Sequence, residues 1–159
     1  MEIRVLGAHE GTVLEHVAPD VFDFDVDPRW ARDFFADPRH HLAVAVEGGQ
    51  VVGMASGVHY VHPDKGPELF VNEVGVAESH QGRGIGRRLL RALFDHARAL
   101  GCGEAWVLTS ESNAAARRLY EAAGGAEEDD RLVMYNFRLS EPALASRLTL
   151  DGGEPRSTS

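Results

Sequence analysis

Hydrophobic and polar positions follow a helical spacing in the middle of the chain. Between Ile85 and Leu100, apolar residues recur every three or four positions, which is the spacing of one buried face of a helix. The residues before the intervening loop, Leu69–Val76, are rich in β-branched and aromatic side chains, a composition that favours a strand. The pattern therefore predicts a strand, a short loop and a long helix that ends at Gly101.

The rest of the chain contains shorter segments of both kinds. Gly48-Gly49 predicts a hairpin turn, Asp27-Pro28 the start of a helix, and Ser112-Asn113 the cap of another helix. Asp20–Asp27 alternates acidic and apolar residues, which fits either a strand or a loop with buried aromatic anchors. Strands are predicted over 3–6, 42–47, 51–60, 69–76, 104–109 and 131–139, and helices over 10–17, 28–36, 85–100 and 114–123.

This order of elements predicts a single domain of the α/β (α+β) class. The chain has 159 residues, enough to bury one core, and it shows no internal repeat. We assign residues 1–140 to the domain and residues 141–159, which are rich in Gly, Ser and Thr at the end, to a loose tail.

Composition and charge narrow the classes of partner. The formal net charge of -9 argues against nucleic acid and favours a cationic substrate. The N-terminus lacks the features of a signal peptide, and no apolar run reaches the length of a membrane span. The single cysteine, Cys102, excludes an intramolecular disulfide. We therefore expect a cytoplasmic protein that binds neither a membrane nor nucleic acid.

The loop after Val76 has the composition of an anion site. Glycines alternate with other residues in Gln81-Gly82-Arg83-Gly84-Ile85-Gly86, so the backbone can bend until successive N–H groups converge. The following helix adds its free amides and the positive end of its dipole, and Arg83, Arg87 and Arg88 add charge. The spacing matches neither the dinucleotide fingerprint nor the P-loop.

The loop matches Gln-x-x-Gly-x-Gly and resembles the acetyl-coenzyme A motif of the GNAT family of N-acetyltransferases. A second segment, Asn113–Gly124, is similar to the family pattern Asn-x-x-Ala-x-x-x-Tyr-x-x-x-Gly. The resemblance covers Ile3 to Leu139 and is most specific from Glu73 to Tyr120. It implies a mixed central sheet with a splayed strand pair, flanked by about four helices.

The resemblance also implies acetyl-CoA as the cofactor and assigns residues to it. The loop amides hold the pyrophosphate, Gly75 lies where two strands separate to admit the pantetheine, and Asn113 contacts the cofactor arm or serves only as a helix cap. The full set of expected cofactor-binding residues is Val74, Gly75, Val76, Gln81, Gly82, Arg83, Gly84, Ile85, Gly86, Arg87, Asn113 and Ala116.

Acetyl transfer to an amine needs a group that accepts the amine proton and one that protonates the leaving thiolate. Glu73 is our candidate base, because the family commonly has an acid on this strand. Uninterrupted alternation would place it on one face with Leu69 and Val71, where an unpaired acid is costly. By the same resemblance, Tyr120 is the candidate acid.

We expect the acceptor to be an amine of a cationic small molecule. The segments 53–76 and 127–137 look most like aminoglycoside 3-N-acetyltransferases, which implies an aminoglycoside substrate and antibiotic resistance. The alternatives are another amine (a polyamine, a small metabolite, a protein N-terminus or a lysine) and a non-catalytic CoA-binding module. Family members are often homodimers. The expected substrate-binding residues are Asp23, Asp25, His59, Tyr60, Glu73, Asp129 and Asp130.

The histidines lack metal-ligand spacing, so we expect no metal.

Overall fold

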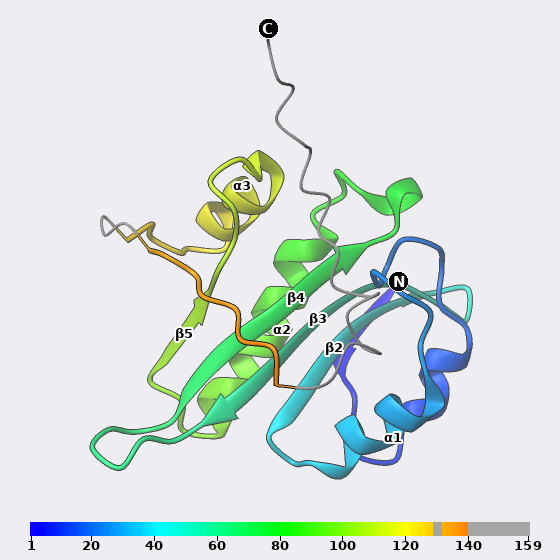
Figure 1. Ribbon diagram of the computed structural model, residues 1–159. Helices are drawn as coiled ribbons and strands as arrows, with labels where there is room; N and C mark the ends of the chain where they lie inside the picture. The colour runs from blue at the N-terminus through cyan, green and yellow to red at the C-terminus, as the bar shows by residue number, and fades with distance from the viewer. Residues whose placement is uncertain (129–131, 140–159) are drawn as a thin grey trace, which may run out of the picture. The chain divides into compact units, whose positions relative to one another are not determined.

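The computed structural model describes residues 1–128 and 132–139, and the chain divides into two parts, Met1–Glu127 and Glu128–Ser159. The first part holds a five-stranded sheet, three α-helices and two short 3-10 helices (Figure 1). Its elements are β1 (Glu2–Val5), η1 (Gly11–Glu15), α1 (Pro28–Ala36), β2 (His40–Glu47), β3 (Gln50–Tyr60), β4 (Glu68–Val76), η2 (Glu78–His80), α2 (Ile85–Ala99), β5 (Glu104–Val107) and α3 (Ala114–Ala122).

The strands lie side by side in the order in which they occur along the chain. The first three pairings are antiparallel, and the β2–β3 hairpin turns at Gly48 and Gly49, both with positive φ as predicted for such a turn. β5 runs parallel to β4 because α2 crosses between them. The predicted mixed sheet is therefore confirmed.

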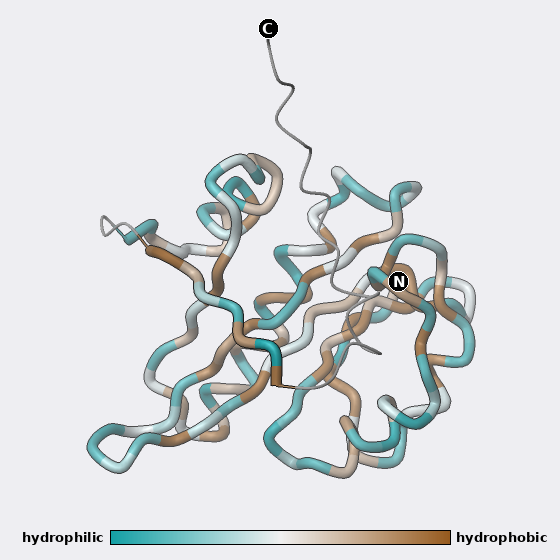
Figure 2. The backbone as a smooth tube through the Cα atoms, viewed as in Figure 1, coloured by the Kyte–Doolittle hydropathy of each residue, from teal (hydrophilic) through white to brown (hydrophobic). Residues whose placement is uncertain are grey.

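Helix α2 covers one face of the sheet, behind β3 and β4 in Figure 1. Its apolar stripe, Leu89, Leu90 and Leu93, is fully buried against the strands, which confirms the helix predicted from the three-to-four spacing. Hydrophobic stretches follow the central strands, whereas the β3–β4 loop is mostly hydrophilic (Figure 2). The core of the first part thus lies between this helix and the sheet.

No helix of the described residues is long and apolar enough to cross a membrane.

The opposite face of the sheet is covered over β2 and β3 by η1 and α1. The Asp27 side chain accepts a hydrogen bond from the Arg29 amide at 2.8 Å, and Pro28 occupies the first turn, so this helix starts where the sequence predicted. Phe34 stacks on His40 at 5.0 Å between ring centroids. Helix α1 is thereby anchored to β2.

A β-bulge at Asn72 changes which side chains share a face of β4. Ser56 pairs with Glu73 and Gly57 pairs with Val71, so Asn72 has no partner in this ladder. Directly paired residues share a face, and Gly57 points toward Leu93 of α2. Glu73 therefore lies on the face opposite α2, and the expectation from uninterrupted alternation that it shares a face with Leu69 and Val71 is wrong.

Two predicted elements differ from those observed. The helix expected over 10–17 is only the 3-10 turn Gly11–Glu15, because residues 16–18 are drawn out to bond Val51 (Ala18 N to Val51 O, 2.8 Å). The strand expected over 131–139 begins outside the described residues, and 132–139 form no strand. A strand forms only where a neighbouring strand exchanges backbone hydrogen bonds with it, which the composition of a single segment does not reveal. The described residues therefore contain three α-helices, where about four helices were expected.

Candidate active site

The strand β4, the loop after it and the start of α2 form one continuous edge of the site. The loop is short because η2 turns the chain at once, with the His80 amide donating to the Ala77 carbonyl at 2.8 Å. The Gln81 side-chain amide donates back to the Val76 carbonyl at 3.1 Å. These bonds hold the glycine-rich segment against the end of the strand.

The glycines of this loop build a cradle for an anionic group. Gly82 and Gly84 have φ values of 71° and 72°, which side-chain-bearing residues rarely adopt, and a Cβ at either would meet open space. The first helical bond of α2 runs from the Arg88 amide to the Gly84 carbonyl, so the N–H groups of the residues between them lie at the uncapped helix start. Open space beside the glycines, the free amides of the helix start and the helix dipole fit the pyrophosphate of coenzyme A.

A gap opens between β4 and β5 next to this loop. The ladder between the two strands ends at the pair Val71–Val107, whereas β4 continues to Val76. Residues 72–76 therefore have no partner on that side within the described part of the chain. This is the splayed strand pair that the sequence predicted.

Glu73 lies on β4 where the gap begins and has an altered affinity for protons. Burial of its side chain raises the pKa of the carboxyl above its ordinary value, and repulsion from the Asp23 carboxylate raises it further. A hydrogen bond from the backbone of Asp23 acts weakly in the opposite direction. Two acidic side chains from the 20–27 loop and from β4 therefore face a common space.

Gly75 is required for a reason that the sequence did not indicate. A Cβ at this position would overlap the Val21 carbonyl oxygen, because the 20–27 loop crosses β4 at this point. The side chain of Val21 is itself buried. Gly75 thus leaves room for the loop that carries Asp23, and the close approach of the cofactor that we expected at Gly75 remains a prediction.

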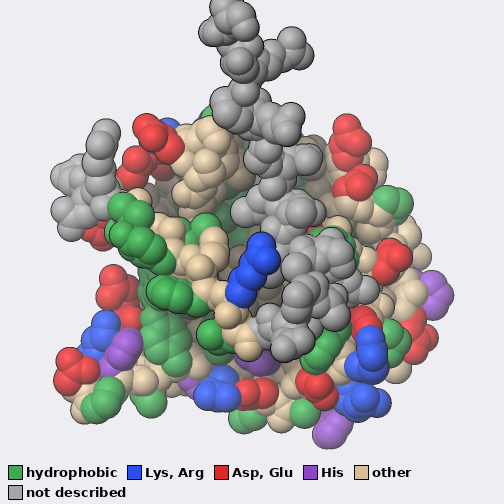
Figure 3. Space-filling model, viewed as in Figure 1, with side chains coloured by type: hydrophobic (Ala, Val, Ile, Leu, Met, Phe, Trp, Pro, Cys, Tyr) green, Lys and Arg blue, Asp and Glu red, His purple; other side chains and the backbone are tan. Residues whose placement is uncertain are grey.

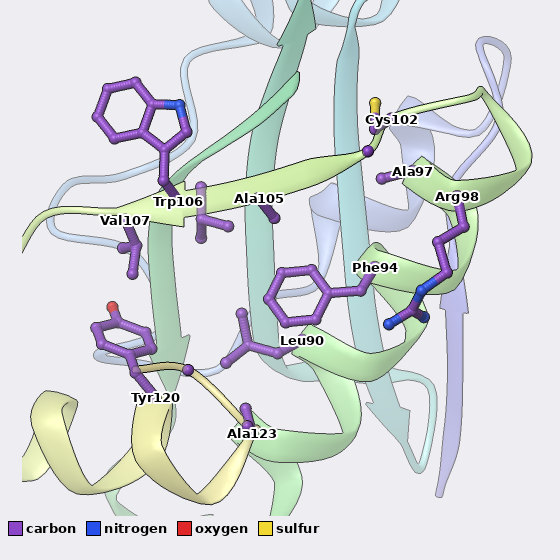
Figure 4. A pocket seen from close by; sticks show the side chains of 14 residues that line it. Leu90, Phe94, Ala97, Arg98, Cys102, Ala105, Trp106, Val107, Tyr120 and Ala123 are labelled. Atoms are coloured by element: carbon purple, nitrogen blue, oxygen red, sulfur yellow. The ribbon is translucent and has the colours of Figure 1, made fainter. Parts of the chain in front are cut away.

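Tyr120, on α3, lines a cavity of about 260 Å³ between α2, β5 and α3. In Figure 4 its hydroxyl points toward Val107, and the side chains of Leu90 and Phe94 border the same space. Burial raises the pKa of Tyr120, which keeps the phenol protonated at neutral pH. Tyr120 and Glu73 therefore approach the end of the β4–β5 ladder from opposite sides of the sheet.

Asn113 caps α3. Its side-chain oxygen accepts a hydrogen bond from the Ala116 amide at 3.0 Å, so the capping interpretation of this residue is confirmed. The cap fixes the first turn of the helix that carries Tyr120. The expected contact of Asn113 with a cofactor remains a prediction.

An aromatic group lies on the same face as Glu73. The Trp106 indole N–H donates to the Tyr60 hydroxyl at 2.6 Å, and the Tyr60 hydroxyl donates to Glu68 at 3.1 Å. Phe70 packs against Trp106 with ring centroids 4.4 Å apart. The β3–β4 loop beside them carries exposed acidic, basic and histidine side chains at the lower left of Figure 3, and its Lys65 forms an ion pair with the buried Glu68 of β4. Sequence reasoning had missed Trp106, since its partners lie on other strands.

His59, which we expected in the substrate pocket, points to the α2 face. Its Nδ1 lies 2.7 Å from Nε2 of His41, and Nδ1 of His41 lies 3.0 Å from Nε2 of His96 on α2. His41 is 5 % exposed, and its two nitrogens face different rings. No three His, Cys, Asp or Glu side chains within 1–128 and 132–139 are arranged to hold a metal ion.

The structure places most of the other expected residues either near Glu73 or in the loop after β4, and two lie outside the described residues. Asp23 lies near Glu73, and Tyr60 lies on the same face of the sheet as Glu73. The expected residues of the glycine-rich loop lie at the end of β4 and the start of α2. Asp25 lies in the same 20–27 segment as Asp23. Asp129 and Asp130 lie outside the described residues.

The chain is similar in sequence to several acetyltransferases. It is 40% identical over 120 residues to the N-alpha-acetyltransferase RimI of Mycobacterium tuberculosis, covering 76% of this chain and 72% of that protein. It is 34% identical over 91 residues to a streptothricin acetyltransferase of Streptomyces lavendulae, covering 57% of this chain and 46% of that protein. A mycothiol acetyltransferase of Thermomonospora curvata is 38% identical over 102 residues, covering 63% of this chain but only 32% of its own length.

Solved structures share the fold at low sequence identity. An aminoglycoside acetyltransferase from an uncultured soil metagenomic sample, in complex with trehalose, superposes with a TM-score of 0.73 at 17% identity, covering 87% of this chain and 96% of the other. AAC(6')-Iy with a CoA-linked bisubstrate analogue gives 0.71 at 22% identity, covering 86% and 97%. The same enzyme has also been solved with CoA bound.

The model of the Acetyltransferase (GNAT) family matches residues 12–125, most of the chain. This range includes the glycine cradle, the splayed strands and the tyrosine of α3. The chain therefore belongs to the GNAT acetyltransferase family and is an N-acetyltransferase that uses acetyl-CoA.

Proposed function

We propose that this enzyme acetylates a cationic amine of the aminoglycoside class, at the 3-amino position, on the face of the sheet that carries Glu73. The observation that carries the proposal is the pair of acidic side chains, Glu73 and Asp23, beside the open end of the β4–β5 ladder. A polyamine sugar presents several ammonium groups, so one can be deprotonated at Glu73 while another is held by a neighbouring carboxylate.

The aromatic group formed by Tyr60, Phe70 and Trp106 supports the same class of acceptor. Its rings lie on the Glu73 face, where Trp106 donates a hydrogen bond to Tyr60, Tyr60 donates one to Glu68, and Phe70 packs on Trp106. An aromatic face attracts an organic cation, and Trp is the strongest of the three for this interaction. This group would orient the ammonium-bearing rings of the acceptor beside the base.

In this proposal, Glu73 accepts the proton from the acceptor ammonium, directly or through a water molecule. Burial and the Asp23 carboxylate raise the pKa of Glu73, which makes its carboxylate a better proton acceptor than that of an exposed glutamate. Acetyl-CoA supplies the activated thioester carbonyl. Tyr120 donates its phenolic proton to the leaving sulfur, and the loop Gln81–Gly86 with the start of α2 binds the pyrophosphate.

A second candidate acceptor is the α-amine of a protein N-terminus. It is favoured by the 40% identity to an N-alpha-acetyltransferase, of which the chain covers 72%. An N-terminal ammonium is also cationic, but it brings one charge and a peptide chain that must lie along the open face. The carboxylates beside Glu73 would then bind only that single charge.

The test is thiol release from acetyl-CoA with gentamicin, kanamycin, spermidine and peptides with free N-termini. We expect the highest kcat/KM with an aminoglycoside, with acetylation of the 3-amino group shown by NMR of the product. Turnover confined to peptides would replace the first acceptor by the second. Acetylation of an aminoglycoside only at another amine would refute the 3-amino assignment but retain the substrate class.

A further inference from the structure

Glu47, the last residue of β2, reaches across to the glycine-rich loop. One carboxylate oxygen lies 2.9 Å from Nε2 of His80, and the other lies 3.4 Å from a terminal nitrogen of Arg83. His80 and Arg83 are 33 and 36 positions away along the chain. The β2–β3 hairpin is thereby joined to both ends of the turn that enters the loop.

The His80 contact is the stronger of the two. Its ring is mostly enclosed, with a side chain 18% exposed, and the other ring nitrogen lies 2.8 Å from the Ser79 hydroxyl. Both nitrogens of His80 are thus held, which fixes the ring and the η2 turn that carries it. Arg83 is nearly half exposed, and its longer contact with Glu47 resembles an ordinary surface ion pair, which contributes little.

His80 directly precedes Gln81, whose side chain closes the loop onto Val76. Any rotation of the η2 turn would therefore displace Gln81 and the amides that follow it. Positioned donors act best when their own supports are fixed, and loss of such a support commonly weakens binding without any loss of a direct contact. A carboxylate next to an anion site is otherwise unfavourable, since like charges repel. Its presence here therefore calls for a compensating role.

We infer that Glu47 is a positioning residue for the cofactor: through His80 it holds the glycine-rich loop in the shape that accepts the pyrophosphate of coenzyme A. The inference rests on the proposed role of that loop. Removing the Glu47 charge should have two opposite effects on the affinity for CoA. Loss of the loop's support should weaken binding, relief of the charge repulsion should strengthen it, and we expect the weakening to be the larger effect.

The experiment compares Glu47→Gln with Glu78→Gln. Glu78 is exposed and lies two residues from His80, so its substitution removes the same charge near the loop and leaves the Glu47–His80 contact in place. Isothermal titration with CoA should give a Kd for Glu47→Gln about fivefold above that of Glu78→Gln, because an interaction with a charged group is lost. The KM for acetyl-CoA should rise with little change in kcat or in the KM for the acceptor.

A double-mutant cycle tests whether the effect runs through His80. If Glu47 acts through His80, then Glu47→Gln combined with His80→Ala should raise the CoA Kd no more than the larger single change. Additive effects would refute that route. Equal Kd values for Glu47→Gln and Glu78→Gln, or tighter binding by Glu47→Gln, would overturn the positioning role.

A separate variant tests whether the loop Gln81–Gly86 binds CoA at all. It distinguishes a failure of that assignment from a failure of the positioning role of Glu47. Gly84→Val places a β-branched residue at a φ of 72° and should abolish CoA binding. If it does so while Glu47→Gln behaves like Glu78→Gln, only the role of Glu47 is refuted. If Gly84→Val, folded by circular dichroism, binds CoA normally, the loop assignment fails and the Glu47 inference fails with it.

Discussion

Glu73 is the residue on which the proposed chemistry most depends, and its surroundings make its protonation testable. Burial and Asp23 both raise its pKa. Activity requires the ionised carboxylate, so kcat/KM should fall as the pH drops through this raised value, at a higher pH than for an exposed glutamate. In Glu73→Gln this acidic limb of the pH–rate profile should disappear, and an unchanged profile would exclude Glu73 as the base.

Asp23→Asn provides a finer test of the same residue. Loss of the neighbouring negative charge should lower the pKa of Glu73, which moves the acidic limb of kcat/KM to lower pH. Asp25→Asn is the matched control, because Asp25 is not among the groups that shift Glu73. An acidic limb that moves equally in both variants would show a general charge effect rather than a specific pair.

Tyr120 can be separated into its ring and its hydroxyl. Tyr120→Phe keeps the ring in the cavity between α2, β5 and α3 and removes only the phenol. If the hydroxyl protonates the leaving sulfur, kcat should fall about a hundredfold, while the Kd for CoA from titration calorimetry changes less than about twofold. Equal losses of kcat and CoA affinity would instead indicate a binding role.

At the scale of the elements, the sequence predicted the long helix α2 and the hairpin correctly because their signals are local. The buried stripe of α2 and the Gly48-Gly49 turn each depend on residues a few positions apart. The bulge at Asn72 leaves no such signal, because β4 contains a run of apolar residues, Leu69–Val71, followed by two polar residues, and no strict alternation that an extra residue would interrupt. Only pairing with β3 decides where the extra residue falls, and therefore which face Glu73 occupies.

Gly75→Ala tests the crossing of the 20–27 loop over β4. The added methyl group would overlap the Val21 carbonyl, so the loop must shift, with a loss of about 1–3 kcal/mol in the free energy of unfolding. Gly66→Ala is the control, since a Cβ there meets nothing within 4 Å, and it should change stability by less than about 0.5 kcal/mol. Denaturant unfolding measures both, and equal stabilities would show that the contact is not restrictive.

At the scale of the whole folded part, the chain of three histidines couples stability to pH. It joins β2, β3 and α2, and the groups around His41 are the imidazoles of His40, His59 and His96. Burial, and secondarily these rings, lower the pKa of His41 to about 4. The unfolded chain, with a histidine pKa near 6.5, binds more protons between these values, so stability should fall as the pH drops from about 6.5 to 4.

The expected loss over this range is on the order of 3 kcal/mol. Denaturant unfolding at several pH values should show it in the wild-type chain, and the dependence should be smaller in His41→Gln. His9→Gln, at an exposed position, is the matched control and should keep the wild-type dependence. A His41→Gln curve parallel to the wild type would contradict the assignment.

The sequence by itself determined the class of the fold and the family resemblance, and it predicted which loop binds the cofactor. Each of these depends on residues close together in the chain: the apolar spacing of α2, the glycines after Val76 and the cap at Asn113. Glu73 and Tyr120 were candidates on the same basis. These signals are local because backbone conformation and helix periodicity are local properties.

Only the tertiary structure decided which distant residues meet. The strand register sets Glu73 opposite Ser56 and turns His59 toward His41. The crossing of the 20–27 loop explains Gly75, and the hairpin brings Glu47 to His80. These contacts join segments far apart in the chain, where a one-residue change in pairing exchanges the two faces of a strand. The composition of the chain and the spacing of its residues do not show which strand register forms.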